Sequence, residues 1–236
     1  LCLSKGLGIT YHLGEYQGEV DYALTKYGAR PLEVMDRLGL TLIKPTVIAH
    51  AVYLSNRERA IVRDRGLGIA WCPTVDSLIM GPHWLPMFSD VLFGFGSDGG
   101  AFTTLDLLHE IKVARAVGKA LTVGMTYDKS SFNSITMLRA LTGWGGLLVG
   151  DNVGVIAEGF KADLITLRLG GVRALPIYDP VEAVVSLLDG HDVNDVLVSG
   201  RFVVRDGNFI DINEDELIER LYDVIPEVQG KLSGMA

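Results

Sequence analysis

The chain has 236 residues, a hydrophobic fraction of 48% and a formal net charge of −8. This length and hydrophobic content predict one sizeable core with a small appendage, and they exclude a largely disordered protein. The acidic balance argues against nucleic acid or an anionic membrane as partner, and no run of about 18 uncharged apolar residues predicts a membrane span.

The first residues and the cysteines bear on the compartment. The opening Leu-Cys-Leu-Ser-Lys-Gly lacks the basic lead and the long apolar core of a signal peptide. Cys2 and Cys72 form neither a disulfide pattern nor a metal motif, so we expect a cytoplasmic protein. The chain lacks a starting methionine and enters an expected buried strand almost at once. We therefore expect that an upstream segment is cleaved off, separately encoded or lost.

Short apolar strands alternate with helices over the first 150 residues. We expect strands that end at His12 and span 46–52, 66–73 and 91–97. Two short helices are expected within 18–40, and further helices over 55–65, 103–119 and 130–142, the last broken by glycines at 143–146. Apolar strands separated by helices are typical of a parallel sheet with crossover helices. Four such units make half of an eight-stranded (β/α)8 TIM barrel.

The pattern changes near residue 150. Short strands are expected at 153–156, 162–167, 181–188, 193–198 and 201–204, separated by glycine-containing turns. A final acidic helix is expected over 213–225, with Asn213 as its cap and Glu216 placed for a capping box. We therefore predict the second half of a hydrolase barrel over 1–150, part of a β-sandwich over 151–212, and a C-terminal helix and tail over 213–236.

Three of the expected strands end at residues that can ligate a metal or carry protons. The first ends at His12, with Glu15 three residues later; another ends at His50, and a third leads into Asp98. The carboxyl ends of parallel barrel strands meet at one rim, where such folds carry their chemistry. In this interpretation His12 ligates a divalent metal, and Glu15 shuttles protons beside it.

Each of these residues also has a plain structural explanation. His12 and Glu15 would be a buried histidine bonded to a helix-capping carboxylate, and His50 would be a satisfied core histidine. Asp98 would cap the turn that follows it, although a carboxylate buried there without donors or a cation is costly. The shared position of all four at one end of consecutive strands favours function over coincidence.

His83 and Trp84 lie in the loop after the third expected strand, on the rim side. They are candidate substrate contacts, with a loop anchored by its aromatic residue as the equally plain alternative. Cys72, before a proline at a strand end, is interpreted as structural.

The order of several motifs resembles a known family. These motifs are Tyr-His-Leu-Gly-Glu at 11–15, Ile-Ala-His-Ala-Val-Tyr-Leu at 48–54, Trp-Cys-Pro-Thr at 71–74 and Gly-Ser-Asp-Gly-Gly at 96–100. The segments 154–165 and 198–207 extend the likeness downstream. Together they resemble the amidohydrolase superfamily, in particular its cytosine-deaminase-like and triazine-chlorohydrolase-like branch, over nearly the whole chain.

The resemblance implies a role for each matching residue. His12 and Asp98 would ligate the metal, Glu15 would be the proton shuttle, and His50 would contact the hydrolytic water or the substrate. Asp98 would also help to deprotonate the water. The implied reaction is hydrolytic deamination of a small nitrogen heterocycle by metal-bound hydroxide, with dechlorination or amide C–N hydrolysis as alternatives. The expected metal is one zinc ion, with iron as the alternative.

One departure from the family pattern matters. The family's His-x-His pair supplies two further metal ligands, and this chain contains no such pair. The resemblance therefore implies an N-terminal half-barrel chain or segment that supplies this pair, and we expect an oligomer. The alternative from another class is a non-catalytic half-barrel that acts only in folding or assembly. The sequence around Asp76 also departs, since Asn or Ser is commoner there, which leaves the choice of substrate open.

Overall fold

The computed structural model describes residues 2–81, 91–100, 103–126, 130, 132–172 and 174–234. It divides into two compact units. The first comprises Leu1–Phe160 and Leu169–His191, and the second comprises Lys161–Arg168 and Asp192–Ala236. Each unit is described by itself.

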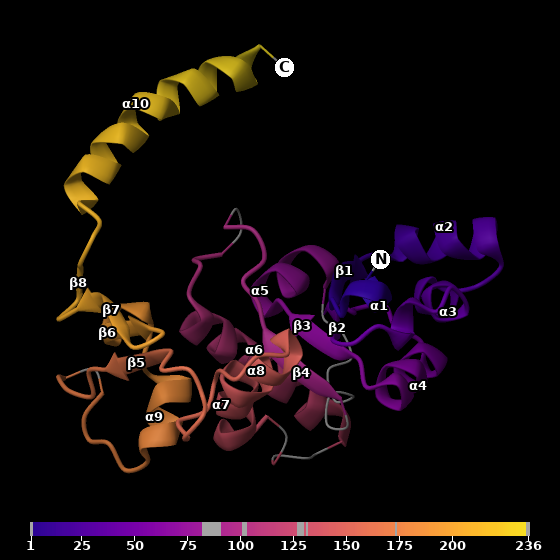
Figure 1. Ribbon diagram of the computed structural model, residues 1–236, viewed down its shortest axis with the longest axis horizontal. Helices are drawn as coiled ribbons and strands as arrows, with labels where there is room; N and C mark the ends of the chain where they lie inside the picture. Colours follow the sequence, from indigo (N-terminus) through magenta and orange to yellow (C-terminus); the bar gives the residue numbers. More distant parts are fainter. Residues whose placement is uncertain are drawn as a thin grey trace. The chain divides into compact units, whose positions relative to one another are not determined.

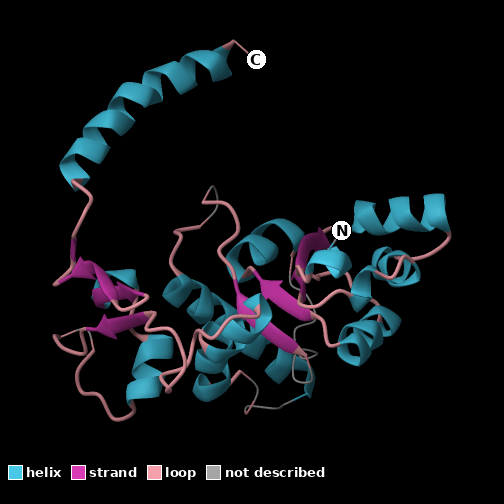
Figure 2. Cartoon of the chain, viewed as in Figure 1, coloured by secondary structure: helices cyan, strands magenta, loops and turns pink. Residues whose placement is uncertain are grey.

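The first unit alternates strands and helices along the chain (Figures 1 and 2). Its elements are, in order, α1 (Cys2–Lys5), β1 (Ile9–Leu13), α2 (Gln17–Tyr27), α3 (Pro31–Arg37), a 3-10 turn (Leu40–Leu42), β2 (Thr46–His50), α4 (Asn56–Arg65), β3 (Gly68–Trp71), α5 (Pro73–Val75), the π-helical turn η2 (Asp76–Met80), β4 (Leu92–Phe95), α6 (Leu107–Thr126), α7 (Ser134–Leu141), α8 (Gly143–Val149) and α9 (Pro180–Ser186). A last 3-10 turn (Gly190–Asp192) begins in the first unit, which ends at His191. The predicted mixed α/β character is confirmed.

Within the described residues, β1 to β4 form a four-stranded sheet in sequence order, and every neighbouring pair is parallel. In the register, Leu13 is the partner of His50 and Trp71 is the partner of Phe95. The carboxyl ends of the strands are therefore level at one edge of the sheet. This arrangement, which the sequence predicts, brings the residues that end β1 and β2 to the same edge as those that follow β4.

The core of the first unit lies between the sheet and its helices. Helices α6, α7 and α8 contact β4, and α8 also contacts β2 (Figure 1). The fully buried Trp71 packs edge-on against Phe93, with ring centroids 6.2 Å apart. Glycine at position 68 is required by close packing, because a Cβ there would overlap the Cδ2 of Leu148 on α8. Helix α8 thus packs closely against the sheet.

Local sequence signals set the ends of α3 and α4, the helices on either side of β2 in the sequence. Ser55 caps α4: its Oγ accepts a hydrogen bond from the Glu58 amide at 3.2 Å, and the Glu58 carboxylate accepts one from the Ser55 amide at 2.9 Å. Gly66, with φ of +58°, ends the same helix in the left-handed conformation. Pro31 starts α3, the second of the two short helices predicted within 18–40, because its fixed φ suits the first turn of a helix.

Two predicted strands, at 181–188 and 153–156, are wrong. The segment 181–188, predicted as a strand from its valines and leucines, forms helix α9, because Asp179 caps two amides of the first turn and Pro180 suits that position. Helix α7 ends at Leu141, just before the glycines at 143–146, as predicted, and these glycines then begin a further helix, α8, that was not predicted. A Cβ at Gly146 would overlap the Val153 carbonyl, so close packing explains this glycine. No strand forms at 153–156.

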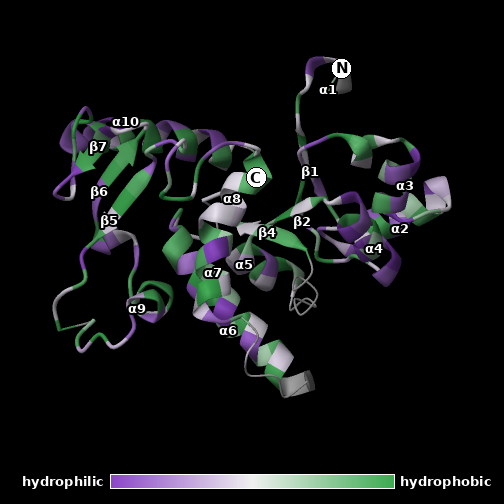
Figure 3. Ribbon diagram, turned by 60° about the horizontal axis from the view of Figure 1, so that its bottom comes forward, coloured by the Kyte–Doolittle hydropathy of each residue, from purple (hydrophilic) through white to green (hydrophobic). Residues whose placement is uncertain are grey.

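In the second unit, the described residues form a four-stranded antiparallel sheet and a helix. The strands are β5 (Leu164–Leu167), β6 (Val193–Val198), β7 (Arg201–Arg205) and β8 (Asn208–Phe209), paired in that order. Helix α10 (Glu214–Ser233) starts where predicted, because the Asn213 side chain accepts a hydrogen bond from the Glu216 amide at 3.3 Å. It carries hydrophobic and hydrophilic residues along its length, and none of its residues is buried (Figure 3). Of the described helices, none is both long and apolar enough to cross a membrane.

Candidate active site

Three of the predicted residues meet at the edge where β1 and β2 end. The exposed His12 ring and the buried His50 ring lie with their centroids 5.2 Å apart and their planes inclined by 31°. An oxygen of the Glu15 carboxylate is 4.0 Å from His50 Nε2, and this side chain retains 30% of its exposure. The parallel register thus brings an imidazole pair and a carboxylate together at one place.

Asp98 follows β4 at the same edge of the sheet. Its side chain is exposed, and its Oδ1 accepts a hydrogen bond from the Gly99 amide at 2.7 Å, as an aspartate that caps a turn does. Its charge also acts on His50. Asp98 therefore meets the predicted structural description of a turn cap and still belongs to the electrostatic surroundings of the histidine.

His50 has a partner that the sequence analysis missed. Its Nδ1 lies 2.7 Å from Oδ1 of Asp76, a fully buried carboxylate in the π-helical turn η2. Burial lowers the pKa of His50, but the hydrogen bond and charge of Asp76, together with the charges of Glu15 and Asp98, outweigh this effect and raise the pKa above the usual histidine value. The available signal was an acidic residue close behind the β3 strand, in a segment that reads as irregular.

The backbone is strained where the candidate residues sit. His50 and Ala51 have φ values of +69° and +58°, and Asp98 has φ of +56°. Residues other than glycine adopt this region at a cost, and such positions cluster at functional sites. The Ala51 amide donates to the Leu13 carbonyl at 3.1 Å, and the Tyr53 amide donates to the Gly14 carbonyl at 2.8 Å. The surroundings of β1 thus hold the strained turn in place.

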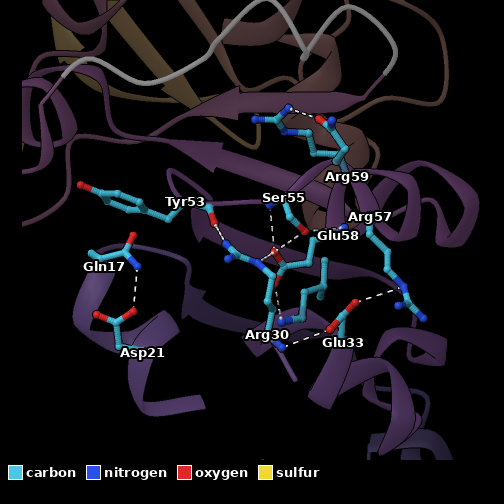
Figure 4. A network of polar contacts seen from close by, with 11 residues as sticks. Gln17, Asp21, Arg30, Glu33, Tyr53, Ser55, Arg57, Glu58 and Arg59 are labelled. Carbon is cyan, nitrogen blue, oxygen red and sulfur yellow. Dashed lines mark hydrogen bonds and ion pairs between the residues drawn. The ribbon is translucent and has the colours of Figure 1, made fainter. Parts of the chain in front are cut away.

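A buried carboxylate network joins the start of α3 to the loop after β2 (Figure 4). Glu58, which is fully buried, accepts hydrogen bonds from Arg30 Nε at 2.6 Å, from the Leu32 amide at 3.1 Å, and from both the amide and Oγ of Ser55 at 2.9 Å. The Arg30 guanidinium also donates to the Tyr53 carbonyl. Arg30 therefore ties the start of α3 to the loop that follows His50.

A second buried carboxylate, Glu110, joins the segments that follow β3 and β4. Glu110 on α6 accepts a hydrogen bond from the Thr74 amide at 2.9 Å and another from Thr103 Oγ1 at 2.6 Å. It therefore joins the turn after β3 to the segment after β4. Beside it, burial raises the pKa of the Cys72 thiol to about 12, so this cysteine is protonated near neutral pH and fits the structural role predicted for it.

The candidate metal ligands are chemically suitable but few. His12 and Asp98 offer an imidazole and a carboxylate, which are donors that zinc accepts. Among the described residues, however, no group of three or more histidines, cysteines or acidic residues is arranged to hold a metal ion. The donors of this chain therefore fit a zinc or iron site in kind and fall short of it in number. His83 and Trp84, the predicted substrate contacts, lie outside the described residues.

The sequence matches the model of the amidohydrolase family over residues 1–203. The chain belongs to the amidohydrolase family. This confirms the resemblance seen in the ordered motifs, which cover the same part of the chain. The matched range includes the residues at the ends of β1, β2 and β4.

Several relatives of this amidohydrolase chain are deaminases. It is 30% identical over 221 residues to 5-methylthioadenosine/S-adenosylhomocysteine deaminase of Pyrococcus abyssi, covering 92% of this chain and 51% of that protein. It is 32% identical over 219 residues to 5'-deoxyadenosine deaminase of Methanopyrus kandleri, covering 91% of this chain and 50% of the relative. The chain thus spans about half the length of the curated relatives it matches.

Solved structures resemble the amidohydrolase chain over a similar share. An adenosine deaminase from Xanthomonas campestris with bound zinc matches 97% of this chain and 52% of its own, with a TM-score of 0.89 and 25% identity. An atrazine chlorohydrolase from Arthrobacter aurescens, complexed with zinc, matches 95% of this chain and 50% of its own, with a TM-score of 0.80. At 20% identity, the second likeness shows the fold alone.

Proposed function

We propose that this chain is the second half of a metal-dependent (β/α)8 barrel hydrolase that removes an amino group from a nitrogen heterocycle by hydrolysis. The observation that carries the proposal is the gathering of His12, Glu15 and His50 at the carboxyl edge of a parallel sheet, with Asp98 following the fourth strand at the same edge. The deaminase names of the relatives point to adenine nucleosides as the first substrates to test.

The burial and the contacts of each side chain suggest its role in the proposed reaction. Glu15 is part-exposed and close to His50, so its carboxylate can carry a proton to the ring nitrogen or to the leaving amine of the substrate. His50 is buried and held, so it presents Nε2 toward the attacking water or the substrate at a fixed place. Together with His50, His83 and Trp84 remain the proposed substrate contacts.

His12 and Asp98 would hold the metal, with zinc proposed first and iron as the alternative. A divalent metal bound there makes water a better nucleophile at neutral pH. Two ligands from this chain are too few for such a site, in which three protein ligands are usual. The proposal therefore includes an N-terminal half-barrel, as a segment or a second chain, that supplies a His-x-His pair.

The sheet is consistent with such a completion. Among the described residues, β1 and β4 are the edges of the parallel sheet, and each pairs on one side only. Unpaired edges of a parallel sheet are normally covered or continued, and closure of a barrel does this for both edges at once. The half-length match to the relatives supports the same arrangement.

The test uses the assembled enzyme, with this chain joined to the half that completes the barrel. Ammonia release is measured with adenosine, 5'-deoxyadenosine, methylthioadenosine, guanine and cytosine, and chloride release is measured with a chlorotriazine. We expect ammonia from at least one heterocycle and none from the Glu15→Gln variant, which should retain its metal. A metal-loaded enzyme that releases no ammonia from any of them would contradict deamination, and an unimpaired Glu15→Gln variant would contradict the proton shuttle.

A further inference from the structure

We propose that Asp76 is a positioning residue for His50: it determines which ring nitrogen carries the proton and holds the other nitrogen toward Glu15. The inference rests on the proposed function, because it adds a residue to the same site. Its basis is the 2.7 Å contact between Asp76 Oδ1 and His50 Nδ1, made by two side chains that are buried almost completely.

The geometry determines the state of the imidazole. An ionised carboxylate can only accept hydrogen bonds, so the nitrogen that faces Asp76 must be the donor. His50 Nδ1 then carries a proton, and Nε2 is the nitrogen that faces Glu15 at 4.0 Å. In a neutral ring with Nδ1 protonated, Nε2 is an acceptor, which can take a hydrogen bond from water or substrate. Without Asp76, either nitrogen could carry the proton, and the ring could turn about its side-chain bonds.

Asp76 is itself held on several sides. Its Oδ2 accepts a hydrogen bond from the Cys72 amide at 3.3 Å, and its own amide donates to the Cys72 carbonyl at 2.9 Å. Glu110 holds the Thr74 amide two residues earlier at 2.9 Å. The carboxylate thus belongs to a turn that is anchored at both the strand and the helix behind it, which suits a group that must orient another side chain.

The local backbone is unusual at both ends of this contact. Asp76 opens a π-helical turn, a conformation that is rare and frequently lies at functional sites. His50 has the strained φ of +69°. A satisfied core histidine has no need of either feature, because a buried imidazole can find partners within regular structure. Both features lie at the two ends of the contact that sets the acid against one specific nitrogen of the ring.

The test must separate positioning from stability, since losing any buried charge partner destabilises a fold. The variants are Asp76→Ala and the nearly isosteric Asp76→Asn, which keeps an acceptor oxygen but removes the charge. Glu58→Gln is the matched control, because it changes another fully buried carboxylate of the same unit that bonds Arg30 and Ser55 instead of His50. All are made in the assembled enzyme.

The first readout is nitrogen-15 NMR of the His50 ring, assigned with His50→Gln. We expect a proton on Nδ1 in the parent, an upfield shift of that proton in Asp76→Asn, and a mixture of protonation sites in Asp76→Ala. Glu58→Gln should lower the melting temperature and leave the His50 ring signals in place. Parent-like ring signals in both Asp76 variants would overturn the proposal. Asp76→Asn alone decides this readout if Asp76→Ala does not fold.

The second readout is the division between kcat and KM. We expect Asp76→Ala to lower kcat by about 10- to 100-fold, the usual cost of losing an orienting partner, with little change in KM. Asp76→Asn should restore most of kcat. An unchanged kcat in Asp76→Ala would overturn the positioning role. If the parent deaminates nothing, the proposed function fails, and the NMR readout still decides the role of Asp76.

Discussion

Replacing Arg30 by methionine should destabilise the first unit far more than removing an exposed arginine from the same region. The change removes the 2.6 Å ion pair with Glu58 and the bond to the Tyr53 carbonyl, and it leaves a buried carboxylate without its charged partner. Breaking a fully buried pair costs about 3–5 kcal/mol. Arg30 is 26% exposed, and the Leu32 and Ser55 donors of Glu58 remain. We therefore expect a cost of about 2–3 kcal/mol.

Arg57 on α4 is the matched control, because it pairs with Glu33 at 3.1 Å but is 81% exposed. Arg57→Met should cost about 1 kcal/mol or less. The assay is urea unfolding of the assembled protein, followed by a spectroscopic signal from the first unit. Combining Arg30→Met with Glu58→Gln should cost less than the sum of the single changes, by about 1 kcal/mol or more. Equal costs for the two arginine variants, or strict additivity in the cycle, would refute the role given to this network.

Three further results follow from the packing and the titrating groups. Gly68→Ala should cost about 1–3 kcal/mol in urea unfolding because its methyl group overlaps Leu148, and Leu148→Ala in the same chain should relieve part of that clash. The Arg115 guanidinium, with nearby hydroxyls, lowers the pKa of Glu182 to about 2. The ionised Glu182 carboxylate therefore stabilises the fold fully above pH 4.5, its pKa in the unfolded chain, and this stabilisation is lost as the pH falls toward 2. The difference in free energy of unfolding between the parent and Glu182→Gln should accordingly shrink between pH 4.5 and pH 2. Cys72 should resist iodoacetamide at pH 8 in the folded protein and react after unfolding, and rapid native labelling measured by mass spectrometry would contradict its burial.

The parallel sheet was predictable because its determinants are local. Apolar strand segments separated by capped helices indicate a parallel sheet, and the register then places His12 and His50 at one edge regardless of distant detail. Helix α9 was predicted wrongly for the opposite reason. Its valine-rich sequence favours a strand, but the Asp179 and Pro180 start signal and the packing of Val185 in the core favour a helix.

For Asp76 the sequence offers only an acidic residue close behind the β3 strand, and this signal does not reveal its partner. Its role depends on a contact with His50, 26 residues away, and on a π-helical turn with no recognisable signature. Glu58 and Glu110 present the same difficulty. Each reads as an ordinary helix carboxylate, yet it accepts a hydrogen bond from an amide of another helix, Leu32 in α3 and Thr74 in α5 respectively. Strand ends can be read from periodicity, whereas the groups that orient their side chains depend on three-dimensional contacts.

Native mass spectrometry of the assembled protein tests the central claim most directly, because one spectrum reports both the polypeptide composition and the bound metal. The account predicts one divalent metal ion per completed barrel, lost when His12 and Asp98 are both replaced by alanine while the polypeptide mass of the assembly persists. Full retention of the metal in that double variant would contradict the assignment of this edge of the sheet as the metal-dependent active site. A parent assembly that binds no zinc or iron would contradict it equally.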